Sequence, residues 1–269
     1  MPQRDEAIFV VHGLDVDAKS VRADVFARKL LTLIAGLREA DRFANGKSTH
    51  SYMIAALSTG SASVTVRQKQ RSRSRPLHSG IAVYEEVASA IYNGDRGVGR
   101  FSDKLIQRVG QLSAGALQTF SHAELAFADD NVIRVDDFLA RQSELANQTL
   151  LAGPEGIHDQ YYRGRAVGSF DGELQEIDNR GLILRGKLIL TAGVEIDCVL
   201  NKDRVPEARE GFGKRVIVEG TAHYDGNEQL PARVDVLAMQ IVGDRPNLLR
   251  WRGAFGSSSG ADTEEDEWC

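Results

Sequence analysis

The stretch GLILRGKLILTAGVEIDCVLN, residues 181–201, has the pattern of two β-strands joined by a turn. Apolar residues alternate with charged ones on both sides of the break at residues 192–193, which is typical of a hairpin that buries one face. Similar runs lie before and after it, at residues 169–180, 214–225 and 232–242. The C-terminal part of the chain is therefore expected to form a small, nearly all-β unit.

The order of these elements points to a particular kind of barrel. Three strands are followed by a short charged segment of helical composition, DRVPEAREGF (residues 203–212), and then by two more strands. This order, with the run GKRVIVEG that opens the fourth strand, resembles the OB (oligonucleotide/oligosaccharide-binding) superfamily over residues 163–243. The resemblance implies a small five-stranded barrel. In members that hold single strands it also implies a groove across the second and third strands, lined by aromatic and cationic side chains.

That groove is neutralised in this sequence. Alternation along the second and third strands separates an apolar inward set from an outward set that includes charged residues. The inward set is Leu182, Leu184, Leu188, Leu190, Val194, Ile196, Cys198 and Leu200. Among the outward residues, Arg185 and Lys187 are expected to pair with Glu195 and Asp197 across the hairpin. No aromatic residue stands on this face, so nucleic acid is expected to bind elsewhere.

The first half of the chain mixes helical and strand-like patterns. Strand-like runs occupy residues 7–11, 51–57 and 61–66, with a second hairpin in residues 122–137, and helical spacing occupies residues 20–43, 80–92, 101–112 and 137–150. This order predicts a largely antiparallel sheet covered by helices. The predicted fold class is α+β, with an α+β domain (1–150), a linker (151–162), the OB-like β-barrel (163–243) and a disordered, flexible acidic tail (244–269).

Charge is distributed unevenly along the chain. Lys and Arg number 33, Asp and Glu number 38, and the net charge is -5. The acids of the last nine residues account for the whole excess, so the rest of the chain is neutral. They are Asp262, Glu264, Glu265, Asp266 and Glu267.

The tail ends on an apolar residue, Trp268, before Cys269. It is similar in kind to the acidic tip of bacterial single-strand-binding proteins, although Trp-Cys stands where that family has Pro-Phe. The resemblance implies that Trp268 and the tail acids dock onto a protein partner. A tail that only improves solubility would have the same composition.

The opposite charge gathers in RQKQRSRSRP, residues 67–76, where every second residue is basic. If the preceding strand continues, alternation puts all five cations on one side, where they can displace counterions from a phosphate backbone. These candidate nucleic-acid contacts are Arg67, Lys69, Arg71, Arg73 and Arg75. A charged edge strand protected from aggregation would look the same.

A second candidate patch lies at the entry to the barrel. Arg163 and Arg165 stand among Tyr161, Tyr162 and Phe170, a mixture that suits nucleic-acid binding. The alternative is that the aromatic residues seal the end of the barrel.

Enzyme chemistry has little support in the sequence. FVVHGLD, residues 9–15, resembles the first strand and loop of TIR-like nucleotide-binding domains, which would imply cleavage of NAD. However, a hairpin follows the first helix where that family has a parallel strand. The histidines are scattered, no phosphate-cradling glycine loop or serine nucleophile elbow occurs, and two cysteines make no thiolate zinc site. We therefore predict no catalytic residue, no cofactor and no metal site.

Hydrophobic residues at 42% and charged residues at 26% are typical of a globular chain. No apolar run reaches the length of a membrane span, the N-terminus lacks a secretory signal, and two cysteines suit a reducing cytoplasm. We predict a cytoplasmic, non-catalytic adaptor that binds nucleic acid through the basic run and a protein through its tail. The main alternative is a purely protein-binding regulator, such as an inhibitor or an antitoxin-like partner of an enzyme. In that case the helices within residues 80–112 or the barrel face would be the interface. A TIR-like enzyme comes third.

Overall fold

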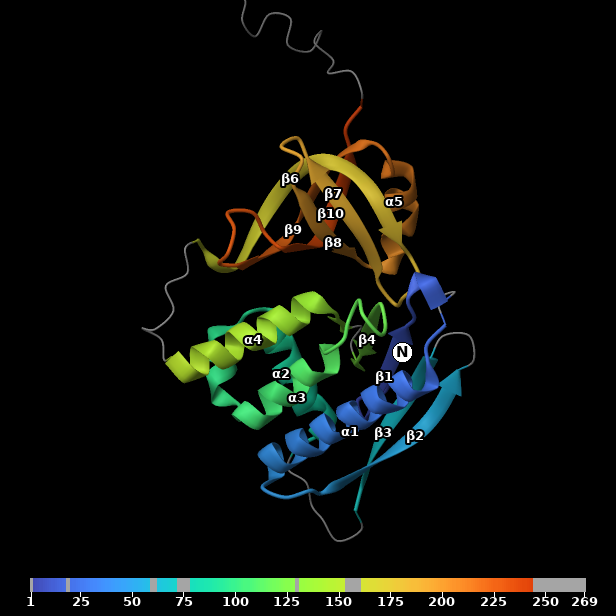
Figure 1. The fold of residues 1–269 in the computed structure, drawn as a ribbon, viewed down its shortest axis with the longest axis vertical. Coiled ribbons are helices and arrows are strands. Elements are labelled where there is room, and N and C mark those ends of the chain that lie inside the picture. The colour runs from blue at the N-terminus through green and yellow to red at the C-terminus, as the bar shows by residue number, and fades with distance from the viewer. Residues whose placement is uncertain are drawn as a thin grey trace, which may run out of the picture.

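The computed structural model describes residues 2–17, 20–58, 62–71, 78–128, 131–152 and 161–243. These residues form a helix-covered sheet followed by a barrel, and the barrel lies against one end of the sheet (Figure 1). The predicted α+β class is confirmed. Each part has its own hydrophobic core.

The N-terminal sheet has strand order β2-β3-β1-β4-β5, and every neighbouring pair is antiparallel. Its strands are β1 (Glu6–His12), β2 (His50–Ser58), β3 (Ala62–Gln70), β4 (His122–Ala126) and β5 (Val132–Val135). β2 is an edge strand whose last six residues are exposed. The two hairpins predicted for this half are therefore present.

Four α-helices cover one face of this sheet (Figure 1). They are α1 (Ala23–Asn45), α2 (Gly80–Tyr92), α3 (Asp103–Ser113) and α4 (Asp137–Ala152). Ser79 and Ser102 begin α2 and α3 by accepting hydrogen bonds from backbone N–H groups at Ala82 and Leu105. α2 buries apolar residues on most of its circumference, and Tyr84 packs so closely on Gly36 of α1 that a Cβ there would collide with its ring.

The C-terminal part is a closed five-stranded barrel with ring order β10-β8-β7-β6-β9. Its strands are β6 (Arg163–Asp178), β7 (Leu184–Leu190), β8 (Glu195–Leu200), β9 (Arg215–Asp225) and β10 (Arg233–Ile241). A short helix, α5 (Val205–Gly211), lies between β8 and β9. β10 pairs parallel with β8 and the other pairs are antiparallel. Five of the predicted inward residues, Leu184, Leu188, Ile196, Cys198 and Leu200, lie in the barrel core, and Leu190 packs against it. Leu182 and Val194 are only half-buried and lie outside this core.

Polar contacts join the sheet to the barrel at several points. The connected pairs are Asp15 with Arg180, Tyr92 with Asp235, Glu124 with Leu182 and Ile183, Asp136 with Arg233, and Thr149 with Arg163. The N-terminal residues of these contacts lie in the β1–α1 connection, α2, β4, the β5–α4 connection and α4. The barrel therefore contacts several strand ends and helices rather than a single element. Within the described residues, no helix is long and apolar enough to cross a membrane.

Candidate functional site

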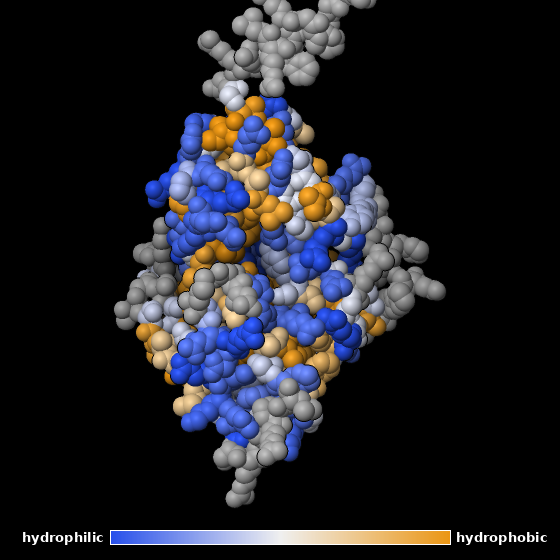
Figure 2. Space-filling model, turned by 180° about the vertical axis from the view of Figure 1, so that it is seen from behind, coloured by the Kyte–Doolittle hydropathy of each residue, from blue (hydrophilic) through white to orange (hydrophobic). Residues whose placement is uncertain are grey.

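The described part of the basic run lies on one face of β3. Val66 is buried under the helices, while Arg67, Lys69 and Arg71 are exposed. Because side chains alternate along a strand, the three cations point away from the helices. We call this surface the basic face. Seen from that side, the N-terminal half is mostly hydrophilic (Figure 2). Arg73 and Arg75 lie outside the described residues.

The basic face continues past the body of the sheet. β1 pairs with β3 only as far as Arg67, whereas β2 pairs with β3 as far as Gln70. Lys69 therefore stands on a two-stranded ribbon, with Arg71 directly beyond it.

One of the three cations is already partnered. Arg67 Nε donates a hydrogen bond to Glu6 Oε1 at 2.8 Å, and this bond raises the pKa of Arg67 and lowers that of Glu6. The Arg67 side chain of this pair is half-exposed, so the pair adds little stability. Among the described residues, Lys69 and Arg71 have no ion pair. They carry most of the unopposed charge on the basic face.

The second predicted patch lies elsewhere. Arg163 donates a hydrogen bond to Thr149 of α4 at 3.4 Å, and Arg165 pairs with His223 of β9. Figure 1 shows the start of β6 near the end of α4, whereas β2 and β3 form the opposite edge of the sheet. Among the described residues, Arg163 and Arg165 therefore do not share a surface with Arg67, Lys69 and Arg71. Tyr162 stacks edge-on against Tyr224 of the barrel.

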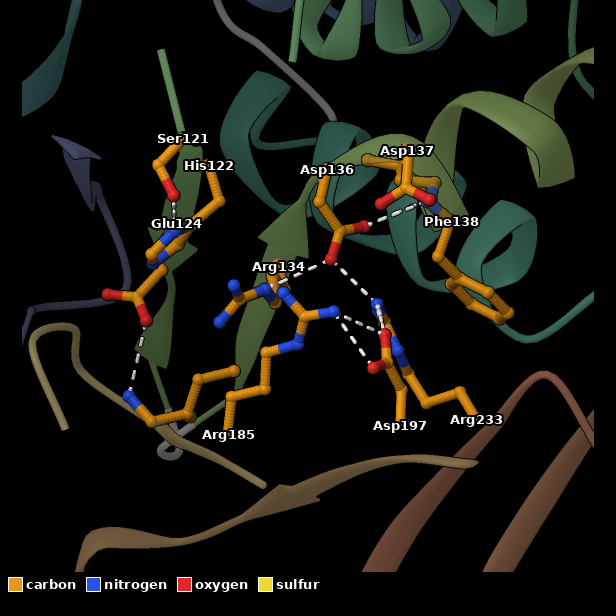
Figure 3. Close-up of polar contacts among 12 residues, drawn as sticks. Ser121, His122, Glu124, Arg134, Asp136, Asp137, Phe138, Arg185, Asp197 and Arg233 are labelled. Atoms are coloured by element: carbon orange, nitrogen blue, oxygen red, sulfur yellow. Dashed lines mark hydrogen bonds and ion pairs between the residues drawn. The ribbon is translucent and has the colours of Figure 1, made fainter. Parts of the chain in front are cut away.

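The N-terminal half covers part of the outer face of β7 and β8, around Arg185 and Asp197, whereas Lys187 and Glu195 are more open to solvent. Arg185 Nη2 donates to both oxygens of Asp197 at 2.8 and 2.7 Å, and Lys187 donates to Glu195 at 3.0 Å. The predicted pairing is confirmed. In addition, Arg185 and Asp197 face the N-terminal half, where they meet Asp136 and its partners (Figure 3).

Asp136 is the centre of a buried charged cluster. It accepts hydrogen bonds from Arg134 Nε at 3.0 Å and from Arg233 Nη2 at 2.7 Å (Figure 3). Burial favours the neutral acid, but Arg233 and Arg134 outweigh that effect and lower the pKa of Asp136 to about 2. Asp136 also caps α4 by accepting from the N–H groups of Phe138 and Leu139. It is therefore a fully ionised structural anion at neutral pH.

Arg233 crosses from the barrel into this cluster. Its side chain is 1% exposed, and its guanidinium lies 4.3 Å from the centroid of the Phe138 ring. Arg233 Nε, Arg233 Nη1 and Arg185 Nε have no hydrogen-bond partner among the described residues. The aromatic contact and Asp136 are therefore the main compensation for the buried cation.

Beside this cluster, Asp235 of β10 joins a tyrosine and a histidine. It accepts from Tyr92 Oη at 3.0 Å, and its other oxygen lies 2.7 Å from His223 Nε2. The rings of Tyr92, His223 and Phe138 pack edge to face. These contacts fasten α2 to the barrel.

A third group of polar side chains lies at the ends of β1 and β4. His12 and His122 are directly opposite in the strand pairing, and their rings stack with centroids 4.3 Å apart. Glu124 stands two residues beyond His122, on the same face of the sheet, and its Oε2 lies 3.4 Å from His12 Nε2. All three are buried, and their ligand atoms lie within 4.8 Å of one another. This is the described group best suited to hold a metal ion.

The barrel closes over Glu124. The Glu124 carboxylate accepts hydrogen bonds from the backbone N–H groups of Leu182 and Ile183 in the barrel. A Cβ at position 181 would collide with the carboxylate, so Gly181 is required at this approach.

The sequence did not predict the buried groups as sites. His12 and His122 are far apart in the chain, and only the strand register brings them together. The one sequence signal for this group was a histidine at a strand terminus, His12 as the last residue of β1 and His122 as the first residue of β4. The helices suggested as a protein interface, α2 and α3, contribute much of the core through their buried faces.

No family model matches this chain, and no curated protein matches it significantly.

Proposed function

We propose that this protein is a non-catalytic accessory protein that binds nucleic acid through the basic face of the β2–β3 hairpin. The observation that carries this proposal is the alignment of Arg67 and Lys69 on one exposed face of β3, with exposed Arg71 directly after the strand. The sequence extends this run through Arg73 and Arg75.

The shape of the hairpin supports binding to phosphates rather than to individual bases. A two-stranded ribbon is narrow enough to lie at the major groove of a duplex, and Lys69 stands on such a ribbon. Cations on the ribbon can then reach the phosphates beside the groove. Tyr52, the aromatic residue of β2, instead directs its hydroxyl to the backbone of α1 at Leu37. The basic face thus lacks the stacking side chains that single-strand binding uses. We expect strongly salt-dependent binding with little sequence preference.

We infer that the barrel is an OB-like module with a structural role. Its strand order and the helix between β8 and β9 support that assignment. In this chain the N-terminal half covers Arg185 and Asp197, on the second and third strands of the barrel. We propose that the barrel stabilises the sheet by packing against it. We also propose that the acidic tail, which lies outside the described residues, recruits a protein partner.

Fluorescence anisotropy tests the nucleic-acid proposal. Labelled single-stranded DNA, duplex DNA and RNA are titrated with the full chain across a salt series. The comparison variants are Lys69→Ala/Arg71→Ala and, as a matched control, Lys187→Ala, which removes an exposed barrel lysine paired with Glu195.

The plot of log K against log salt has a negative slope, and each lost phosphate contact makes it shallower by about 0.9. The double variant should therefore give a slope shallower by about 2. The control should keep the wild-type slope. Removal of residues 261–269 should strengthen binding if the acidic tail competes for the basic face. Absence of binding to all three ligands at low salt would refute the proposal.

A second candidate, a protein-binding regulator, is favoured by the edge strand β2. Met53, Ile54 and Leu57 are more than half exposed on it, and an open apolar edge can accept a strand from a partner. Such a partner should be displaced by Ile54→Glu and should not respond to Lys69→Ala/Arg71→Ala. The two sets of variants therefore separate the two functions.

A further inference from the structure

Two imidazoles and one carboxylate meet at the boundary between the sheet and the barrel. We propose that His12, His122 and Glu124 form a binding site for a divalent transition-metal ion of the zinc class. Their potential ligand atoms lie within 4.8 Å of one another and all three residues are buried. Two histidines and a glutamate are a ligand set that zinc accepts.

The backbone builds this arrangement. His12 and His122 are register partners in β1 and β4, so their side chains leave the sheet side by side. Glu124 follows His122 by two positions, which returns its side chain to the same face. The three ligands therefore stand on paired strands rather than on loops, and their positions are set by the hydrogen-bonded sheet.

The distances suit a shared ion after a small adjustment. Ligand atoms of a tetrahedral ion with bonds of about 2.1 Å lie about 3.4 Å apart, and His12 Nε2 and Glu124 Oε2 are 3.4 Å apart. The two imidazole planes are inclined by 19°. The χ2 torsion of histidine is broad, so a turn of the His122 ring can bring its free nitrogen toward the same point.

Neighbouring groups hold the ligands as they do in metal sites. Ser121 Oγ lies 3.1 Å from His122 Nδ1. In the tautomer with its proton on Nδ1, His122 donates to Ser121 and leaves the Nε2 lone pair free. On the other side, the N–H groups of Leu182 and Ile183 fix Glu124. Such outer contacts are a regular feature of metal ligands.

The charge of the site also favours a cation. Glu124 is completely buried, yet among the described residues it has no ion pair with a lysine or an arginine. Arg134 contributes positive potential nearby, but its hydrogen bond goes to Asp136. A bound ion would neutralise the carboxylate directly. Because the barrel backbone holds that same carboxylate, the ion would also strengthen the junction between barrel and sheet.

The test uses the full chain, freed of metal with a chelator and titrated with Zn²⁺ by calorimetry and by thermal unfolding. The comparison variants are His12→Ala/His122→Ala, Glu124→Gln and His78→Ala. The last removes an exposed histidine outside the cluster, whose hydrogen bonds to Asn45 are made by its backbone and not by its ring. Wild type and His78→Ala should bind one equivalent of Zn²⁺ and gain thermal stability from it. The double variant should lose roughly 100-fold or more in affinity.

Co²⁺ gives a readout that does not depend on any variant. In the wild-type chain it should show the intense visible absorption of a four-coordinate ion with nitrogen ligands, and Zn²⁺ should displace it. Glu124→Gln, which preserves the side-chain shape, should weaken binding even if the double variant fails to fold. The proposal is overturned if the wild type binds no Zn²⁺, if the Co²⁺ spectrum is that of a six-coordinate aquo ion, or if the histidine variant binds as tightly as the wild type.

Discussion

The β2–β3 hairpin and the boundary between sheet and barrel use the same residue types for opposite purposes. On the hairpin, Arg67, Lys69 and Arg71 remain in water. At the boundary, Arg134 and Arg233 are almost completely buried around Asp136. Surface cations cost little to maintain and are available to an anionic ligand, whereas buried cations depend on every partner that they have. Burial, rather than residue type, therefore decides which arginines are accessible for the proposed contact with nucleic acid.

The largest expected effect comes from breaking the boundary at Arg233. Arg233→Met leaves Asp136 buried without its closest barrel cation, and should cost about 3–5 kcal/mol of unfolding free energy. Arg67→Met removes a half-exposed pair with Glu6 and should cost only about 0.2–1 kcal/mol. Urea unfolding of both variants measures the contrast. Equal losses would mean that the boundary cluster is not a special structural element.

A smaller loss is expected where the barrel touches Glu124. Gly181→Ala places a methyl group against the carboxylate and should cost about 1–3 kcal/mol, as overpacking usually does. The matched control is Gly243→Ala, where a Cβ would meet nothing within 4 Å. Thermal unfolding of the two variants gives the difference. An unchanged thermal stability in Gly181→Ala would show that the β6–β7 loop does not hold the Glu124 carboxylate in a fixed position.

Acid should weaken the boundary through Asp136. Its pKa in the folded chain is about 2, below the ordinary value of 3.8, so folding favours the ionised form. Its contribution is therefore complete above about pH 5 and disappears as the pH falls through 3.8 toward 2, a loss of about 2 kcal/mol.

Unfolding free energies at pH 6 and pH 2.5 measure this effect. The difference in unfolding free energy between pH 6 and pH 2.5 should be smaller by about 2 kcal/mol in Asp136→Asn than in wild type. Asp137→Asn, at a half-exposed neighbour, should retain the wild-type difference. An unchanged difference in Asp136→Asn would contradict the assignment of Asp136 as a buried anion.

The smallest effect on stability belongs to the hairpin. Lys69→Ala/Arg71→Ala removes two exposed cations without ion pairs among the described residues, and should change the unfolding free energy by about 0.5 kcal/mol or less. The same double variant is the one expected to weaken nucleic-acid binding and to reduce its dependence on salt. A large loss of stability would show that the basic face is a structural surface, and the comparison between the two regions would then fail.

The sequence predicted the fold far better than the candidate site. Period-2 alternation located Leu184 and Leu188 in the barrel core and paired Arg185 with Asp197, because these depend on local strand geometry. Alternation could not show that the N-terminal half covers this pair. Arg233 shares the charged, alternating pattern of an ordinary exposed strand residue, and only the docking of two distant segments makes it buried.

Hydrogen exchange of the full chain, with and without duplex DNA at low salt, distinguishes binding at the basic face from binding at the barrel. We expect slower exchange in the β2–β3 hairpin, residues 50–71, and unchanged exchange in β7 and β8, where the N-terminal half lies against Arg185 and Asp197. Slower exchange in β7 and β8 with an unchanged hairpin would contradict the proposed function and would assign nucleic-acid binding to the barrel instead.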